Sequence, residues 1–273
     1  MELNVREIQQ ESLKILKVID KIAKQEKLQY VLFFGSLLGA VRHKGFIPWD
    51  DDLDILMFRP DYEKLKSYFI SHQSELEPFE FFCPEFRKDY PYIIGRICNT
   101  NFSFVADAEK DCGMGTFVDI YPIDGAGNGK HKFTYYESCL LTTIYALKNK
   151  THFIRPFSKM KVLIKGILFF LCRLFPYAFL QNKLRHLSTK FTLASSEYVA
   201  CMSWMDGGKP VIFKKEDLEK TVLIDFEDGK YPVVKNYDDI LQQLYGDYMQ
   251  FPPENERVGH HYYKIFPKTE AKK

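Results

Sequence analysis

Four aspartates, Asp50, Asp51, Asp52 and Asp54, stand within five consecutive residues. The surrounding residues 46–58 have the composition of a strand, in which residues two apart point to the same side at a spacing of about 7 Å. Asp50, Asp52 and Asp54 would then share one face, and Asp51, pointing away, would be dispensable. Like charges on one face repel unless a divalent cation neutralises them, so the run predicts a metal site. The alternatives are a solvated acidic cluster and a helix-capping loop.

A second feature, Gly35-Ser36, follows the aromatic and β-branched residues 30–34 and precedes a helical pattern. A glycine lets the backbone approach a phosphate closely, and the free N–H groups at a helix start bind anions, with the Ser36 hydroxyl as a further donor. A Gly-Ser pair alone is weak evidence. Followed one supersecondary unit later by an Asp-x-Asp strand, it predicts a phosphate cradle beside a metal site.

A two-metal site needs a further carboxylate from a neighbouring strand, and Asp119 offers one within the apolar residues 117–121. A single strand-end aspartate more often bonds to a turn, a role that Asp124 fits better. The nearest cations for phosphate oxygens are Arg42, Lys44 and Arg96, each of which could equally be a surface charge.

The elements that position these groups follow from hydropathy. Apolar residues at a 3.6-residue period predict an N-terminal helix that ends near Lys27, and Pro60 favours the start of a helix over residues 61–72. Further strands are expected at residues 92–98, 102–106 and 116–121, and a last helix at residues 237–245. We therefore expect an α+β fold with a mixed sheet flanked by helices, plus a helical subdomain.

The turn-forming residues 124–129 mark the clearest break in the chain. We expect a catalytic core over residues 1–128, a helical subdomain over residues 129–210 and a C-terminal segment, residues 211–273, that returns to the active site.

Residues 162–180 are dense in Leu, Phe and Ile but are interrupted by Lys165, Arg173 and Pro176. This falls short of the roughly 20 uncharged residues of a spanning helix. A core helix is favoured, and the alternative is a membrane-surface helix over residues 157–185 whose basic side chains face lipid headgroups.

The bulk composition excludes several classes of protein. With 38 Lys and Arg against 36 Asp and Glu, no whole-chain field exists to hold a nucleic acid. The first residues lack a secretory signal pattern, which predicts a cytoplasmic protein. The six scattered cysteines fit neither a disulfide framework nor a zinc site and are expected to be reduced.

The motifs together resemble the LicD phosphotransferase family, whose relatives include the fukutin-related proteins. The resemblance rests on residues 35–42 (GSLLGAVR), residues 48–54 (PWDDDLD) and residues 117–122 (FVDIYP), and on a C-terminal block of residues 244–249 (LYGDYM) with Pro252-Pro253 and His260-His261. It covers roughly residues 30–124 and 225–263. It implies a nucleotidyltransferase fold.

The resemblance implies transfer of phosphocholine from CDP-choline to a sugar hydroxyl of a teichoic acid or surface glycan precursor, with release of CMP. Asp52, Asp54 and Asp119 would be the catalytic metal ligands, Asp50 would add to the metal site, and Mg²⁺ or Mn²⁺ would be the cofactor. Gly35-Ser36 would hold the phosphates. A lipid-linked acceptor would place the protein peripherally on the inner face of the membrane.

A quaternary ammonium such as choline binds among aromatic faces. The candidates for choline or acceptor contacts are Trp49, Tyr92, Tyr121, His260 and His261. Other readings stay open: transfer of another CDP-linked polyol or sugar phosphate, a glycosyltransferase whose Asp-x-Asp holds the Mn²⁺ of a nucleotide sugar, and a non-catalytic nucleotide-binding protein.

Overall fold

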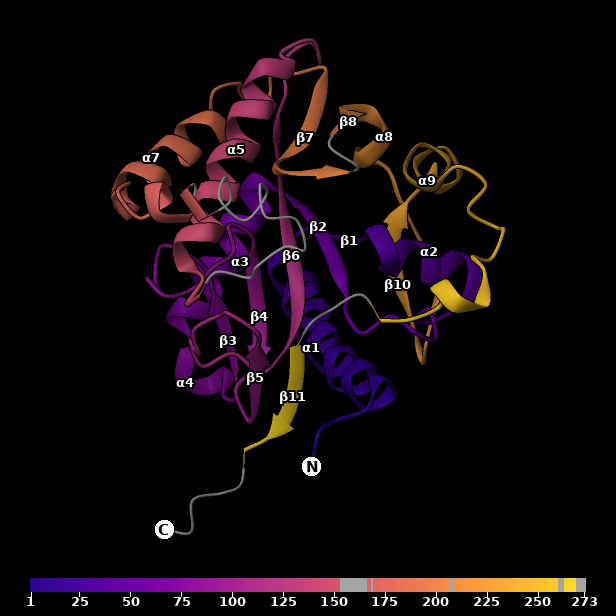
Figure 1. The fold of residues 1–273 in the computed structure, drawn as a ribbon. Coiled ribbons are helices and arrows are strands. Elements are labelled where there is room, and N and C mark those ends of the chain that lie inside the picture. The colour runs from indigo at the N-terminus through magenta and orange to yellow at the C-terminus, as the bar shows by residue number, and fades with distance from the viewer. Residues whose placement is uncertain (153–165, 168, 207–208, 260–262, 269–273) are drawn as a thin grey trace.

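The computed structural model describes residues 1–152, 166–167, 169–206, 209–259 and 263–268 of the chain (Figure 1). Its centre is a seven-stranded sheet in the order β1-β2-β6-β4-β3, extended by β7 beside β6 and β8 beside β7. The β2–β6 pair is parallel and the other pairs are antiparallel. The strands are β1 (Val31–Leu32), β2 (Asp54–Phe58), β3 (Phe79–Phe82), β4 (Gly95–Asn99), β6 (Thr116–Gly125), β7 (Tyr198–Asp206) and β8 (Lys209–Lys214).

Helices cover this sheet on both flanks (Figure 1). They are α1 (Val5–Glu26), α2 (Phe34–His43), α3 (Arg59–Ser71), α4 (Gln73–Leu76), α5 (Lys132–Asn149), α7 (Tyr177–Ser188), α8 (Lys215–Glu219) and α9 (Tyr237–Tyr245), with a 3-10 turn at Glu254–Glu256. In Figure 1, α5 and α7 lie together on one side of the long strand β6, and α2 and α9 lie on the other. The mixed sheet flanked by helices confirms the expected fold class.

Two smaller strand pairs complete the fold. Strands β9 (Thr221–Phe226) and β10 (Gly229–Val234) form a hairpin. Strand β11 (Tyr263–Pro267), close to the C-terminus, pairs with β5 (Phe102–Ala106), so that Tyr263 lies opposite Ala106. The last described strand therefore lies against an early part of the chain.

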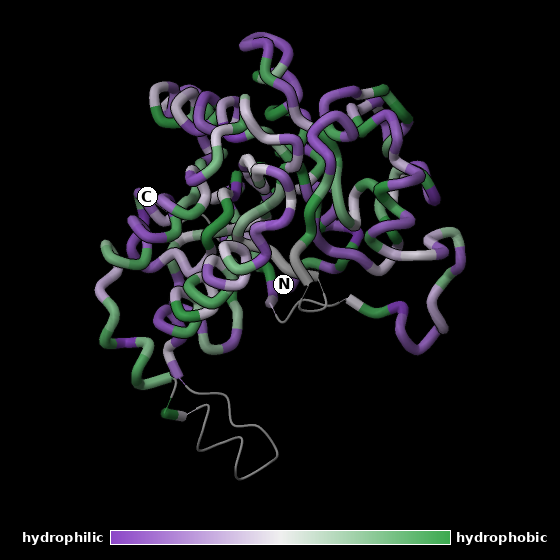
Figure 2. The backbone as a smooth tube through the Cα atoms, turned by 90° about the horizontal axis from the view of Figure 1, so that it is seen from above, coloured by the Kyte–Doolittle hydropathy of each residue, from purple (hydrophilic) through white to green (hydrophobic). Residues whose placement is uncertain are grey.

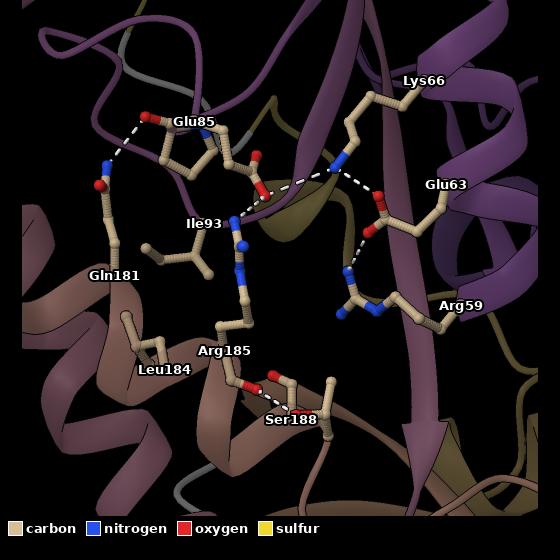
Figure 3. A pocket seen from close by; sticks show the side chains of 11 residues that line it. Arg59, Glu63, Lys66, Glu85, Ile93, Gln181, Leu184, Arg185 and Ser188 are labelled. Carbon is tan, nitrogen blue, oxygen red and sulfur yellow. Dashed lines mark hydrogen bonds and ion pairs between the residues drawn. The ribbon is translucent and has the colours of Figure 1, made fainter. Parts of the chain in front are cut away.

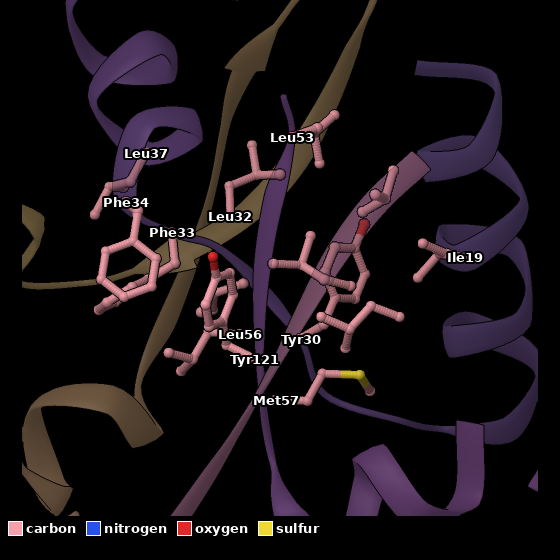
Figure 4. Packing of buried hydrophobic residues seen from close by; sticks show 14 of the residues in the cluster. Ile19, Tyr30, Leu32, Phe33, Phe34, Leu37, Leu53, Leu56, Met57 and Tyr121 are labelled. Atoms are coloured by element: carbon pink, nitrogen blue, oxygen red, sulfur yellow. The ribbon is translucent and has the colours of Figure 1, made fainter. Parts of the chain in front are cut away.

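The amphipathic helix α1 anchors the core. A capping box at Asn4 and Glu7 starts it, and Lys27, near which the sequence predicts the end, caps it in the left-handed region. Its buried stripe, which includes Ile15 and Ile19, packs beside the central strands (Figure 4). Burying each such side chain stabilises the fold by roughly 1.5–3 kcal/mol.

Three strand boundaries differ from expectation. Strand β2 begins at Asp54, not near residue 46, because Pro48 has no N–H for a ladder and the Asp50 N–H closes a turn on the Ile47 carbonyl at 3.0 Å. Strand β4 begins at Gly95, and β6 continues past Tyr121 to Gly125 because β7 pairs with its end. The prediction that Asp50 and Asp52 lie on a strand was therefore wrong.

The middle of the chain contributes α5 and α7, and residues 153–165 and 168 lie outside the described part. Leu180, Leu184 and Leu187 of α7 are buried with Leu141 and Tyr145 of α5. Within the described residues we find no helix with the length and hydropathy needed to cross a bilayer. All six cysteines are free thiols, as expected.

Candidate active site

A cavity of about 480 Å³ gathers the carboxylates of Asp50, Asp52, Asp54 and Asp119. Asp54 and Asp119 are register partners on the parallel strands β2 and β6. Strand pairing thus brings together two residues 65 positions apart in the sequence. Asp50 and Asp52 reach the same cavity from the connection before β2, while the side chain of Asp51 does not line it.

Buried polar side chains hold this connection in place. The Gln9 amide of α1 donates to the Ile47 carbonyl at 3.1 Å and to the Asp50 carbonyl at 2.7 Å. The Ser36 hydroxyl accepts the Asp54 backbone N–H at 2.8 Å. Ser36 is buried and supports the start of β2; it does not line the cavity.

Gly35 places the Asp50 carboxylate against the start of α2. A Cβ atom at Gly35 would lie 2.6 Å from Asp50 Oδ2, so this close approach requires a residue without a side chain. The preceding Phe34 also lines the cavity and has φ at 47°, which is strained for an aromatic residue. Gly35, which the sequence predicts to let a phosphate approach the backbone, therefore also lets the Asp50 carboxylate approach it.

Asp119 forms a buried ion pair with Arg96 of β4. The guanidinium Nε and Nη2 donate to the two carboxylate oxygens at 2.5 and 3.2 Å, and both side chains are buried. Burial lowers the pKa of Arg96, but the charge and hydrogen bond of Asp119, together with the nearby Tyr92 and Tyr90, raise it, so that the pKa lies well above its usual value. The guanidinium also lies 3.7 Å from the centre of the Tyr92 ring and 4.0 Å from that of Phe117.

Aromatic side chains complete the cavity wall. Tyr92 and Tyr121 line it, as do Tyr245 of α9 and Tyr263 of β11. Burial, and then the negative charges of Asp54, Asp119 and Asp52, raise the pKa of Tyr121 well above its usual value. Tyr121 therefore stays a neutral O–H group across the physiological pH range.

Sequence patterns alone did not identify Gln9, Phe34, Tyr245 or Tyr263 as part of the site. Gln9 had a detectable signal, because a polar residue in phase with the apolar stripe of a helix is buried and needs a partner. Tyr245 lies within the C-terminal block LYGDYM, in the segment expected to return to the active site, although no role was assigned to it. Nothing in the local sequence of Tyr263 separates it from core aromatics.

The other predicted residues are dispersed. Arg42 and Trp49 line a second pocket of about 580 Å³, which shares Gly35, Asp50 and Tyr245 with the cavity. Lys44 is exposed at the C-terminal end of α2 and lines neither space. His260 and His261 lie outside the described residues.

The donor set has the chemistry of a site for a hard cation. Four carboxylates around one cavity provide the oxygen ligands that Mg²⁺ and Mn²⁺ prefer. Across the described ranges, no three carboxylate, imidazole or thiolate groups already converge into a metal-binding group. The ligand types therefore fit a divalent cation, and Arg96 neutralises one of the four charges in this structure.

Comparison with known proteins identifies the family of this chain. The family model described as the LicD/FKTN/FKRP nucleotidyltransferase domain matches residues 27–165. The lipopolysaccharide cholinephosphotransferase LicD of Haemophilus influenzae is 28% identical over 276 residues, covering 95% of this chain and 97% of the relative. An uncharacterized protein of Rickettsia typhi is 33% identical over 40% of this chain and 33% of its own length. The chain therefore belongs to the LicD/FKTN/FKRP family and is a phosphotransferase built on its nucleotidyltransferase domain.

Proposed function

We propose that this protein transfers phosphocholine from CDP-choline to a hydroxyl group of a teichoic acid or surface glycan precursor. The observation that carries the proposal is the cavity in which Asp50, Asp52, Asp54 and Asp119 face one space at the start of α2. The full-length similarity to a lipopolysaccharide cholinephosphotransferase supports the choice of passenger group.

The reaction exchanges one P–O bond for another. The acceptor oxygen bonds to the phosphorus that carries choline, the bond from that phosphorus to the bridging oxygen breaks, and CMP leaves with that oxygen. The hydroxyl proton passes to a base, and the product is a phosphodiester. An in-line displacement of this kind depends on positioning and charge stabilisation and needs no protein nucleophile.

The residues divide these tasks. Asp52, Asp54 and Asp119 would hold Mg²⁺ or Mn²⁺, with Asp50 beside them. A bound divalent cation supplies charge neutralisation for the diphosphate and lowers the pKa of a coordinated hydroxyl. The neutral O–H of Tyr121 is a hydrogen-bond donor toward an anionic substrate, and the buried Arg96 orients Asp119.

Release of CMP from CDP-choline, with and without glycan acceptors, tests the proposal directly. The same assay with CDP-ribitol and with UDP-sugars separates the alternatives. We expect release from CDP-choline that requires Mg²⁺ or Mn²⁺ and stops on chelation. Release of UDP alone would replace the proposal with a glycosyltransferase, and release from CDP-ribitol alone would change the passenger.

Matched variants locate the chemistry. Asp52→Asn and Asp54→Asn should each abolish turnover while the protein stays folded, because relieving crowded carboxylates costs little stability. Asp51→Asn makes the same change of charge in the same run, outside the cavity, and should retain turnover. Turnover in Asp52→Asn and Asp54→Asn that equals the turnover of Asp51→Asn would refute the site.

A lipid-linked acceptor would require the protein to act at the inner face of a membrane, and the surface of α5 and α7 supports this extension of the proposal. Residues 130–196 contain twelve Lys and Arg but only one acidic residue, Glu137. Large apolar side chains are exposed in the same region, including Phe133 at 81%, Leu174 at 76% and Phe170 at 71%. Figure 2 shows hydrophobic segments of the backbone at the outer edge of the molecule.

An excess of basic residues and exposed apolar side chains in one stretch of the chain favour an anionic bilayer. Flotation with vesicles of phosphatidylglycerol and phosphatidylcholine should carry the protein, and vesicles of phosphatidylcholine alone should carry less. Phe133→Glu should weaken flotation with the anionic vesicles. The control Leu223→Glu changes a side chain that is 61% exposed on β9 and should not. Absence of flotation by the wild-type protein would remove membrane binding from the proposal and leave the chemistry intact.

A further inference from the structure

The second pocket, of about 580 Å³, has no role in the chemistry described so far. It shares Gly35, Asp50 and Tyr245 with the carboxylate cavity, so the two spaces adjoin at the Asp50 side chain. A transferase with two substrates needs two binding spaces that meet at the reacting phosphorus. The arrangement of cavity and pocket meets that requirement.

The two spaces differ in how their walls are exposed. In the cavity, Asp54, Asp119 and Tyr121 are only 4–6% exposed. On the pocket's own wall, Phe251 is 47% exposed, and Asp247, Gln250 and Glu256 are exposed as well. Buried walls enclose a small molecule, whereas an exposed rim lets a long molecule continue into solvent. The pocket therefore suits a substrate of which only one end reacts.

The pocket surface combines aromatic planes with hydrogen-bonding groups. The rings of Trp49 and Phe251 lie 6.5 Å apart at 58°, and the pocket wall also carries Gln250, Asp247 and Glu256. A sugar ring presents apolar C–H faces to an aromatic plane and hydroxyl groups at its edge to carboxylates and amides. The aromatic and hydrogen-bonding groups of the pocket wall therefore match the apolar faces and the hydroxyl groups of a sugar ring.

Choline fits this pocket less well. The Arg42 guanidinium lies 4.7 Å from the centre of the Phe251 ring, and that of Arg257 lies 5.4 Å from Phe251 and 5.8 Å from Trp49. The faces that would attract a quaternary ammonium are therefore next to two cations, which repel another. A neutral sugar is not repelled by these two positive charges.

Hydrogen bonds within the chain hold the pocket wall in shape. Arg42 of α2 donates to the Tyr248 carbonyl at 2.9 Å, and Arg257 donates to the Pro252 carbonyl at 2.9 Å. These bonds tie the segment after α9 to α2 and to itself. A preformed site loses less entropy on binding.

We propose that this second pocket binds a sugar ring of the acceptor glycan, stacked on Trp49 and Phe251, with the reacting hydroxyl directed past Asp50 into the carboxylate cavity. The inference rests on the proposed phosphotransfer and assigns its two substrates to the two spaces. Trp49 then contacts the acceptor and not choline.

Binding measurements test this assignment without turnover. Saturation-transfer difference NMR would use the methyl glycosides of glucose, galactose and N-acetylglucosamine as sugar probes, and CMP with Mg²⁺ as the donor-side probe. We expect at least one glycoside to bind the wild-type protein and to bind Phe251→Ala about tenfold more weakly. CMP should bind both equally.

Met249→Ala is the matched control, because Met249 lies in the same segment, is 55% exposed and does not line the pocket. Its glycoside binding should equal that of the wild-type protein. The proposal is overturned if no glycoside binds, if Phe251→Ala binds glycosides normally, or if that variant loses CMP instead. A failure of CMP release from CDP-choline would refute the proposed function and leave these binding results standing.

Discussion

Replacing Gly35 with alanine should greatly reduce turnover while leaving the protein folded. The added Cβ would lie 2.6 Å from Asp50 Oδ2, whereas ordinary van der Waals contact begins at 3.4 Å. The carboxylate must therefore retreat by about 0.8 Å. Misplacing a reacting group by about 1 Å can cost on the order of 100-fold in rate, and we expect a loss of that size.

The stability of this variant should change little. The group that must move is the end of a flexible side chain, and alanine is favoured over glycine in a helix by roughly 0.5–1 kcal/mol. The two effects oppose each other, so the melting temperature should stay within about 3 °C of the wild-type value.

Gly39, in the same helix, provides the contrast. A Cβ there would lie 2.5 Å from the backbone carbonyl oxygen of Gly45, which cannot rotate away. Gly39→Ala should therefore destabilise the fold by about 1–3 kcal/mol or more. CMP release and thermal unfolding of both variants check the pair. Wild-type turnover in Gly35→Ala would refute the placement of Asp50, and equal melting temperatures in the two variants would refute the packing argument.

Two further predictions concern groups that support the carboxylates. Ser36→Ala leaves the Asp54 N–H without its 2.8 Å acceptor, so we expect about 1–3 kcal/mol lower stability in urea unfolding together with slower turnover. Full stability would show that water replaces the hydroxyl. Arg96→Met leaves Asp119 buried without its ion-pair partner and should destabilise by about 3–5 kcal/mol, whereas Arg96→Met combined with Asp119→Asn should recover stability and remain inactive. An Arg96→Met protein that stays as stable as the wild type and only binds donor more weakly would instead assign Arg96 to the phosphates.

Elements with strong local signals were predictable from the sequence. Helix α9 (Tyr237–Tyr245) and strand β5 (Phe102–Ala106) occupy the expected residues, and α1 ends at Glu26 with Lys27 as its C-cap, near the expected end. In these elements the local sequence preference and the tertiary packing select nearly the same boundaries.

The geometry of the acidic run was not predictable in the same way. Asp50, Asp52 and Asp54 line one cavity, but strand alternation is not the reason, because β2 begins only at Asp54. The backbone at Asp50 is held by a turn and by the Gln9 amide of α1. The Gln9 bonds join residues about 40 positions apart in the sequence, and no local sequence pattern specifies which residues they join.

The roles of the basic residues depend on the same long-range pairing. A sequence can place Arg96 on a strand near the carboxylates, but the register of β4 against β6 sets Arg96 directly opposite Asp119. Because of that register, Arg96, a candidate phosphate ligand, is the ion-pair partner of the buried Asp119. The net charge of the cavity therefore depends on a residue of β4. Arg42 follows the same logic, since its bond to the Tyr248 carbonyl exists only because the segment after α9 folds back on α2. Both arginines therefore bind other groups of the protein, at contacts that only the fold creates. These contacts shape the two spaces in which the substrates would meet.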